Sequence, residues 1–261
     1  MMTLDSKKTV RELAVEVPSA TSVFQKHGID FCCGGHKSLA EACQAAKLPV
    51  ESVLEDLSAA EADRFARSET YKDWSREALS DLIDQIVNKH HAYVQAENPR
   101  LNALALKVAG KHGPNHPELN AVQSTFEALA EELRLHMMKE EQVLFPYISR
   151  LEEAVIGGEP VVPPPFGQVE RPVQKMMQEH DGAGDLLRKL RELTDDYRIP
   201  DDACMSYRML YNGLVDFESD LHQHIHLENN ILFPRAVALE GDRHAAIVVE
   251  CAPGHCCIDQ N

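Results

Sequence analysis

The sequence lacks the features that mark membrane, secreted and nucleic-acid-binding proteins. No stretch reaches the roughly 18 uninterrupted apolar residues of a membrane span, and the first residues lack the apolar run of a secretion signal. Basic residues are few: 26 Lys and Arg stand against 42 Asp and Glu, and the formal net charge of -16 would repel phosphate backbones and anionic lipid surfaces. We therefore expect a cytoplasmic protein that binds neither nucleic acid nor a membrane.

The cysteines do not form the pattern of a disulfide framework. Seven are present, an odd number, and two pairs are adjacent, Cys32 with Cys33 and Cys256 with Cys257. This usage suits reduced thiols or redox chemistry in a reducing compartment. The last residues carry Cys251, His255, Cys256 and Cys257 without a Cys-x-x-Cys spacing, so a flexible reduced tail is favoured over a soft-metal site, which stays an open alternative.

No strand-like alternation occurs, and the apolar positions instead recur at intervals of three and four. Four long segments have this helical pattern, and Gly- and Pro-containing turns separate them. We predict an all-α protein with a small helical N-terminal domain at 1–60, a linker at 61–74, a four-helix bundle at 75–240 and a Cys-rich tail at 241–261. In the small domain, Cys32, Cys33, Gly34 and Gly35 are expected on a loop between a helix that ends at Gly28 and one capped by Ser38.

One motif occurs twice. The pattern His-x-x-x-Glu-x-x-x-Leu-Phe-Pro begins at His136 and again at His224. On a helix, side chains four residues apart lie on the same face, so His136 pairs with Glu140 and His224 pairs with Glu228. Each copy therefore presents an imidazole and a carboxylate together, which is half of a metal site.

Two further histidines lie on apolar helix faces. His180 lies on such a face in the third segment, and His90 lies on one in the first. The adjacent His91 is flanked at helical offsets by Asn88 and Gln95, so His90 is the predicted inward residue. A lone inward histidine is more often a hydrogen-bonded core residue, but several unpaired imidazoles and carboxylates in one apolar seam would be costly to desolvate without a cation. The predicted metal ligands are His90, His136, Glu140, His180, His224 and Glu228.

This donor set suits iron, zinc, manganese or nickel. Six ligands can serve one octahedral ion, or two ions if both glutamates bridge, and the second arrangement leaves coordination positions open. We therefore predict two non-haem irons joined by an oxygen bridge. The Glu-x-x-His motif of ferritin-like di-iron bundles is absent from these helices, which disfavours iron storage or peroxide detoxification and favours a hemerythrin-like site.

Several motifs in order resemble one known family, the iron-sulfur cluster repair di-iron proteins, or repair of iron centres, of the YtfE and ScdA type. The resemblance spans about residues 9–240. It is carried by Asp30-Phe31-Cys32-Cys33-Gly34-Gly35, His136-Met137-Met138-Lys139-Glu140-Glu141-Gln142, Glu179-His180-Asp181, Met209-Leu210-Tyr211-Asn212-Gly213 and Leu227-Glu228-Asn229-Asn230.

The resemblance implies a hemerythrin-like bundle whose di-iron centre helps to restore iron-sulfur clusters after nitrosative or oxidative stress. It implies the same six ligands, with both glutamates as bridges, and it makes Cys32 and Cys33 candidates for passing electrons, nitric oxide or iron toward the bundle. The expected partners are damaged iron-sulfur proteins, with nitric oxide or oxygen as small ligands. Nitric oxide reductase-like activity, a homodimer, and a reversible oxygen or nitric oxide carrier or sensor remain open alternatives.

Overall fold

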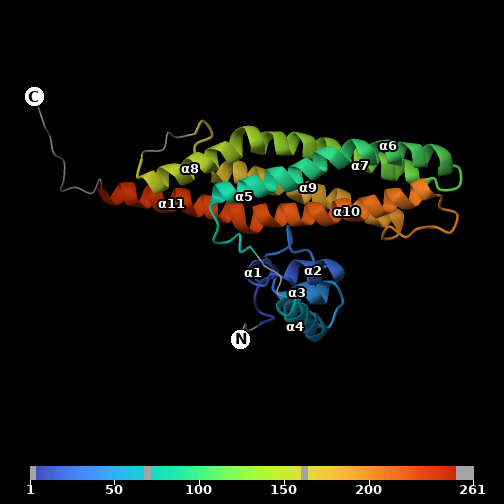
Figure 1. Ribbon diagram of the computed structural model, residues 1–261, viewed down its shortest axis with the longest axis horizontal. Coiled ribbons are helices and arrows are strands. Elements are labelled where there is room, and N and C mark those ends of the chain that lie inside the picture. Colours follow the sequence, from blue (N-terminus) through green and yellow to red (C-terminus); the bar gives the residue numbers. More distant parts are fainter. Residues whose placement is uncertain (1–3, 68–71, 160–163, 251–261) are drawn as a thin grey trace, which may run out of the picture.

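The computed structural model describes residues 4–67, 72–159 and 164–250, with side chains to residue 241. Within these ranges the regular structure is helical, apart from one isolated bridge between Thr9 and Ser38. This confirms the predicted all-α class. A long bundle and a small domain lie side by side (Figure 1).

The small domain consists of α1 (Val10–Glu16), α2 (Ala20–Lys26), α3 (Leu39–Ala45) and α4 (Val50–Ala66). Thr9 and Ser38 each form a capping box, in which the side chain caps the helix and a glutamate three residues later returns a bond to the cap. Gly28 has a φ of +65°, as expected after the end of α2. The loop between α2 and α3 carries Cys32 and Cys33.

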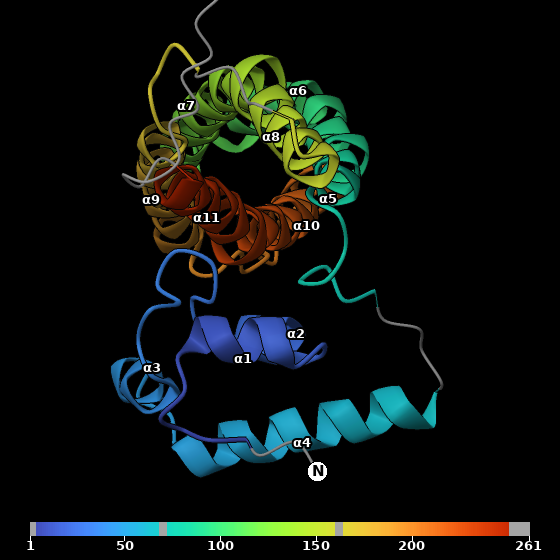
Figure 2. The same cartoon turned by 90° about the vertical axis from the view of Figure 1, so that its left-hand side faces the viewer.

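The bundle contains four long antiparallel rods, three of which include a π-helical turn. The first is α5 (Leu79–Gln85), η1 (Ile86–His91) and α6 (Ala92–His112), and the second is α7 (Glu118–Lys139), η2 (Glu140–Leu144) and α8 (Phe145–Gly157). The third is the uninterrupted α9 (Glu170–Thr194), and the fourth is α10 (Met205–Leu227), η3 (Glu228–Leu232) and α11 (Phe233–Glu250). Seen end-on, the rods form a ring, and a loop of the small domain reaches it beside α9 and α11 (Figure 2).

Two helices extend past the predicted domain boundaries. α4 continues past residue 60 to Ala66, and α11 continues past residue 240 to Glu250. The predicted tail residues Cys251, His255, Cys256 and Cys257 lie outside the described residues.

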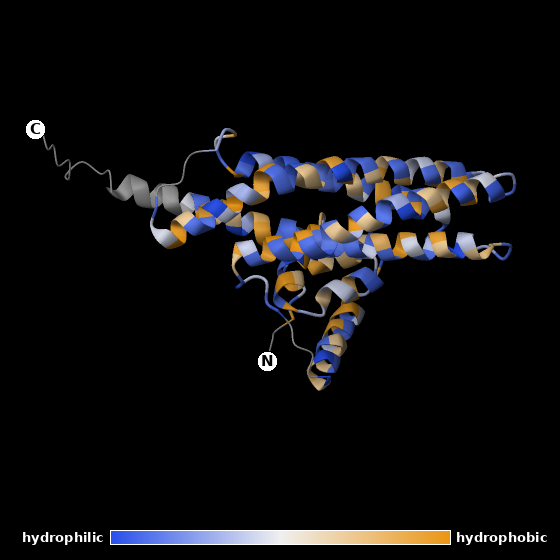
Figure 3. Ribbon diagram, turned by 45° about the horizontal axis from the view of Figure 1, so that its top comes forward, coloured by the Kyte–Doolittle hydropathy of each residue, from blue (hydrophilic) through white to orange (hydrophobic). Residues whose placement is uncertain are grey.

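The core has two apolar clusters, one toward each end of the bundle. One includes Phe126 and Phe217 and continues into the small domain through Phe31, while the other includes Ile148 and Phe233. Hydrophilic and hydrophobic residues alternate along the rods, as amphipathic helices require (Figure 3). Among the described helices, none combines the length and apolar character that crossing a membrane requires. Buried histidines and glutamates lie where the two apolar clusters meet.

Candidate metal centre

Two groups of metal-binding side chains share the same two glutamates. One group is His91, Glu140, His224 and Glu228, and the other is His136, Glu140, His180 and Glu228. Within each group the donor atoms all lie within 4.8 Å of one another, and all six side chains are buried. Each group therefore offers two imidazole nitrogens and two carboxylates to one cation.

Each glutamate directs one oxygen toward each group. Glu140 places Oε1 3.2 Å from His136 Nε2 and Oε2 3.5 Å from His91 Nε2. Glu228 places Oε2 3.1 Å from His180 Nε2 and Oε1 2.9 Å from His224 Nε2. A carboxylate with one oxygen on either side of a shared pocket has the geometry of a bridge.

The imidazoles face each other in pairs through Nε2. The two Nε2 atoms lie 2.9 Å apart in His136 and His180, and 3.1 Å apart in His91 and His224. On the far side of the rings, three Nδ1 atoms meet oxygens: His91 meets Glu141 at 2.8 Å, His136 meets Glu179 at 2.9 Å and His180 meets Asn229 at 2.9 Å.

These outer contacts fix the tautomers. A carboxylate can only accept a hydrogen bond, so Nδ1 of His91 and His136 donates and Nε2 is the nitrogen directed into the pocket, where it holds either a proton or a cation. Two facing lone pairs repel each other unless a proton or a cation lies between them. The ring orientation that results is the one that metal-ligating histidines adopt.

The pocket is charged as well as buried. Burial alone would lower the pKa of His91, but the close carboxylates of Glu140 and Glu228 outweigh it and raise the pKa to about 10. Burial opposes the rise at His136 too, but the charge of Glu140 raises its pKa to about 9. Burial and the charge of Glu228 would raise the pKa of Glu140, yet the neighbouring histidines hold it below its ordinary value.

Several oxygens of these glutamates remain unsatisfied. Both Glu140 oxygens and Glu228 Oε2 lack a well-formed hydrogen bond to any part of the chain that the structure describes. Buried carboxylates without full hydrogen bonding are costly unless a cation compensates them. The donor set, its burial and its unsatisfied oxygens therefore fit divalent metal ions.

The structure brings five of the six predicted ligands together and places His91, rather than His90, at the sixth position. His90 is buried outside the pocket, where its Nδ1 contacts Asp220 Oδ1 at 2.9 Å and its ring stacks on His224. The π-helical turn explains why His91 and not His90 enters the pocket. Residues 86–91 have more than 3.6 residues per turn, so the residue that faces the pocket lies about one position later than in a regular α-helix. The prediction from the sequence assumed regular α-helical spacing and therefore gave His90, the neighbour of His91.

The cysteine loop lies directly against this pocket. Cys33 Sγ is 3.7 Å from the carbonyl oxygen of His180 and 3.9 Å from Cys32 Sγ. Asp30 Oδ1 accepts hydrogen bonds from the backbone N–H groups of Cys32 and Cys33, which holds the two thiols on one side of the loop. The contact with Cys33, followed by burial, raises the pKa of Cys32 well above its ordinary value, so this thiol is protonated at neutral pH.

A cavity of about 340 Å³ lies between α7 and α9, beside the pocket. His136 and His180 line it, together with the small residues Gly182 and Ala183. Lys139 donates to Glu179 at 2.6 Å and so holds the carboxylate that contacts His136. This cavity lies next to only one of the two ligand groups.

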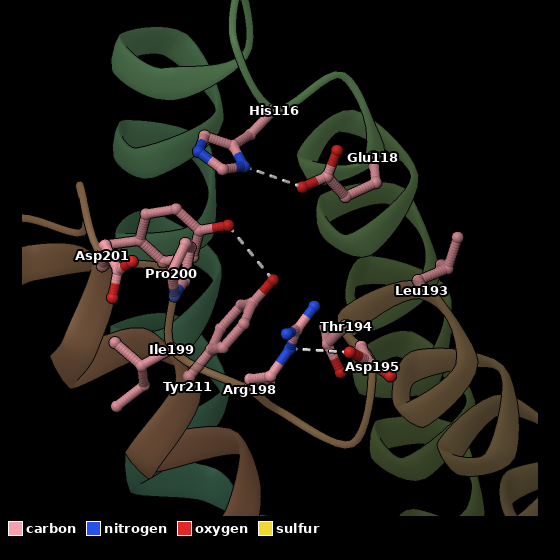
Figure 4. Close-up of a pocket in the computed structure, with 11 residues that line it drawn as sticks. His116, Glu118, Leu193, Thr194, Asp195, Arg198, Ile199, Pro200, Asp201 and Tyr211 are labelled. Carbon is pink, nitrogen blue, oxygen red and sulfur yellow. Dashed lines mark hydrogen bonds and ion pairs between the residues drawn. The ribbon is translucent and has the colours of Figure 1, made fainter.

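A second cavity, of about 450 Å³, lies at the end of the bundle formed by the α6–α7 and α9–α10 connections (Figure 4). His116 Nδ1 lies 3.0 Å from Glu118, and Asp195 and Arg198 pair at another part of the wall. Nearby, His112 Nε2 lies 3.1 Å from Cys204 Sγ. The sequence pattern does not indicate this pair, because the two residues lie far apart in the chain. The structure groups no metal ligands among the described residues of this cavity.

The fold and the site together define a hemerythrin-like, cation-binding helical bundle. Residues 82–236 match the family described as the hemerythrin HHE cation binding domain, and residues 6–61 match ScdA_N, described as a domain of unknown function. This confirms the predicted hemerythrin-like bundle with its small N-terminal domain.

The chain is similar to proteins named iron-sulfur cluster repair protein YtfE. The relative from Yersinia pseudotuberculosis serotype IB (strain PB1/+) is 36% identical over 225 residues, which cover 86% of this chain and 94% of the relative. The relative from Yersinia pestis (strain Pestoides F) has the same identity and coverage. The chain belongs to this family of iron-sulfur cluster repair proteins.

Proposed function

We propose that this protein repairs iron-sulfur clusters damaged by nitrosative or oxidative stress, and that it does so with two iron ions. The proposed ligands are His91 and His224 on one side, His136 and His180 on the other, and Glu140 and Glu228 between them. The observation that carries the proposal is that both glutamates turn one oxygen to each histidine pair. Family membership supports the repair function.

The donors favour iron for this task. Each group provides two nitrogens and two oxygens and no thiolate, which iron, zinc, manganese and nickel accept. Zinc has no redox chemistry, so it would supply neither electrons nor iron to a damaged cluster. Two irons would supply one-electron redox chemistry and open coordination positions for a diatomic ligand.

The protein's own residues prepare the pocket. Glu141, Glu179 and Asn229 orient three of the four imidazoles, while the adjoining apolar clusters limit the access of water. The Cys33 thiol lies against the backbone of His180, and the Cys32 thiol lies next to it, which suits the pair to deliver electrons, nitric oxide or iron to that side.

A reversible oxygen or nitric oxide carrier or sensor is the second candidate. The cavity beside His136 and His180 favours it, because about 340 Å³ is ample for a diatomic molecule. Stopped-flow spectra distinguish the candidates: a carrier binds and releases nitric oxide unchanged, whereas nitric oxide reductase-like activity yields nitrous oxide and oxidised iron.

The repair function is tested on an aconitase-type enzyme inactivated by nitric oxide. We expect the iron-loaded protein to restore more activity than the same amount of ferrous iron with thiol. Replacing both Cys32 and Cys33 with serine should slow repair while leaving bound iron unchanged. If the wild-type protein does no better than free iron with thiol, it is not a repair protein.

A further inference from the structure

Asn229 connects the metal pocket to the cysteine loop. Its side-chain Oδ1 lies 2.9 Å from His180 Nδ1, and its Nδ2 donates to the backbone carbonyl of Cys32 at 3.2 Å. Only 3% of Asn229 is exposed. One buried amide group therefore contacts a proposed metal ligand on one side and the N-terminal domain on the other.

The two copies of the repeated motif differ at the position that Asn229 occupies. Asn229 follows Glu228 as Glu141 follows Glu140, and both residues contact the outer nitrogen of a pocket histidine. Glu141 can only accept a hydrogen bond, so it orients His91 without help. An amide presents either its oxygen or its nitrogen, so its orientation depends on its other neighbour.

The backbone carbonyl of Cys32 determines the orientation of the Asn229 amide. A carbonyl oxygen only accepts, so it draws the Asn229 Nδ2 toward itself and directs Oδ1 toward His180. Oδ1 in turn requires a proton on His180 Nδ1, which leaves the Nε2 lone pair directed into the pocket. Without the loop, the amide could rotate and present its nitrogen to His180, which would favour the opposite tautomer.

We propose that Asn229 is a positioning residue that couples docking of the cysteine loop to metal binding by His180. This inference rests on the proposed function, because it requires a metal ion at His180. Coupling between two binding events is reciprocal. A metal ion in the pocket therefore holds the cysteine loop closed, and a docked loop strengthens the metal site.

The neighbouring Asn230 provides a matched control. Its Nδ2 donates to the carbonyl of Phe31 at 2.8 Å, so it also holds the loop. Its other contact is His226 Nδ1 at 2.8 Å, and His226 belongs to neither ligand group. Loss of the Asn230 donor should loosen the loop without affecting the metal pocket.

The experiment measures alkylation of Cys32 and Cys33 under argon, with and without ferrous iron, by mass spectrometry of the separate peptides. Cys204, at the start of α10, serves as the internal reference. In the wild-type protein, iron should slow labelling of the pair roughly three- to ten-fold, the effect of about one hydrogen bond. Labelling of Cys204 should not change.

The same substitution at the two positions separates the roles. Asn229→Asp keeps an acceptor for His180 and loses the donor to Cys32. It should therefore bind iron more weakly than the wild type, and at saturating iron its thiols should be alkylated at the same rate as in its iron-free form. In Asn230→Asp, Cys32 and Cys33 should be alkylated faster than in the wild type both with and without iron. The ratio of the two rates should stay that of the wild type. Circular dichroism verifies the fold of each variant.

Two results would overturn the coupling alone: wild-type protein that contains iron yet labels as fast as the iron-free form, or Asn229→Asp that retains the wild-type ratio. In the second case iron slows labelling without the Asn229 amide, for example by binding the thiols directly, and Asn229 does not couple the two sites. If elemental analysis finds no bound iron in the wild-type protein, the metal proposal fails, and the coupling with it.

Discussion

At the scale of single residues, two adjacent histidines have different roles. Nε2 of His91 faces His224 across the pocket, whereas His90 is held by Asp220 and its ring stacks on that of His224. Both are almost fully buried, so burial alone does not separate them. The difference lies in which carboxylate each imidazole meets.

Substitution of each histidine tests this assignment. His91→Ala should lower bound iron by about one ion per chain, because it removes a ligand from one group only. His90→Ala should retain both ions, with some loss of stability because Asp220 loses its partner. Elemental analysis of the two purified variants measures the difference. The reverse pattern would restore His90 as the ligand.

Cys204 provides a residue-scale prediction away from the pocket. Backbone hydrogen bonds from the start of α10, chiefly at Tyr207, and the contact with His112 lower its pKa to about 7. Alkylation of Cys204 should therefore reach half its maximal rate near pH 7 and level off above it, since the thiolate is the nucleophile. His112→Ala should move this midpoint upward. An unchanged midpoint would show that His112 does not stabilise the thiolate.

At the scale of elements, the sequence predicted the rods but not the π-helical turns. The His136–Glu140 and His224–Glu228 pairs were predicted correctly as neighbours, because each pair lies at the end of a regular α-helix whose π turn begins only at the glutamate. His180 lies on the uninterrupted α9 and was also placed in the pocket. His90 and His91 end a π turn, where a period of 3.6 fails.

The end of α4 is a second feature that the sequence pattern did not predict. No glycine or proline interrupts residues 60–66, and the alanines and charged residues there are good helix formers, so α4 continues beyond the polar stretch that indicated a linker. Composition indicated where the apolar pattern weakens, but a solvent-exposed helix needs no apolar pattern to continue. The docking of the cysteine loop on η3 could not be predicted, because it joins residues far apart in the chain.

The cysteine loop depends on close backbone packing at Gly35. A Cβ at this position would lie 2.9 Å from the carbonyl oxygen of Phe31 and 3.2 Å from Arg11 Cβ. Gly35→Ala should therefore lower the free energy of unfolding by about 1–3 kcal/mol. Gly110→Ala, in α6 with open space around it, should instead raise it by about 0.5–1 kcal/mol. Urea unfolding followed by circular dichroism measures both, and equal stability of the Gly35 variant and the wild type would contradict the packing argument.

At the scale of the whole molecule, the two domains share one apolar cluster, and the metal pocket lies just beyond their contact. The small domain thereby places two thiols beside a buried pocket that the bundle builds alone.

The central claim is that two irons share Glu140 and Glu228. Mössbauer spectroscopy of protein loaded with ⁵⁷Fe, combined with elemental analysis, tests it most directly. The account predicts about two irons per chain with magnetically coupled spectra, and leucine in place of either glutamate should lower the count to one or none. A single uncoupled iron, or zinc alone in protein grown with ample iron, would contradict it.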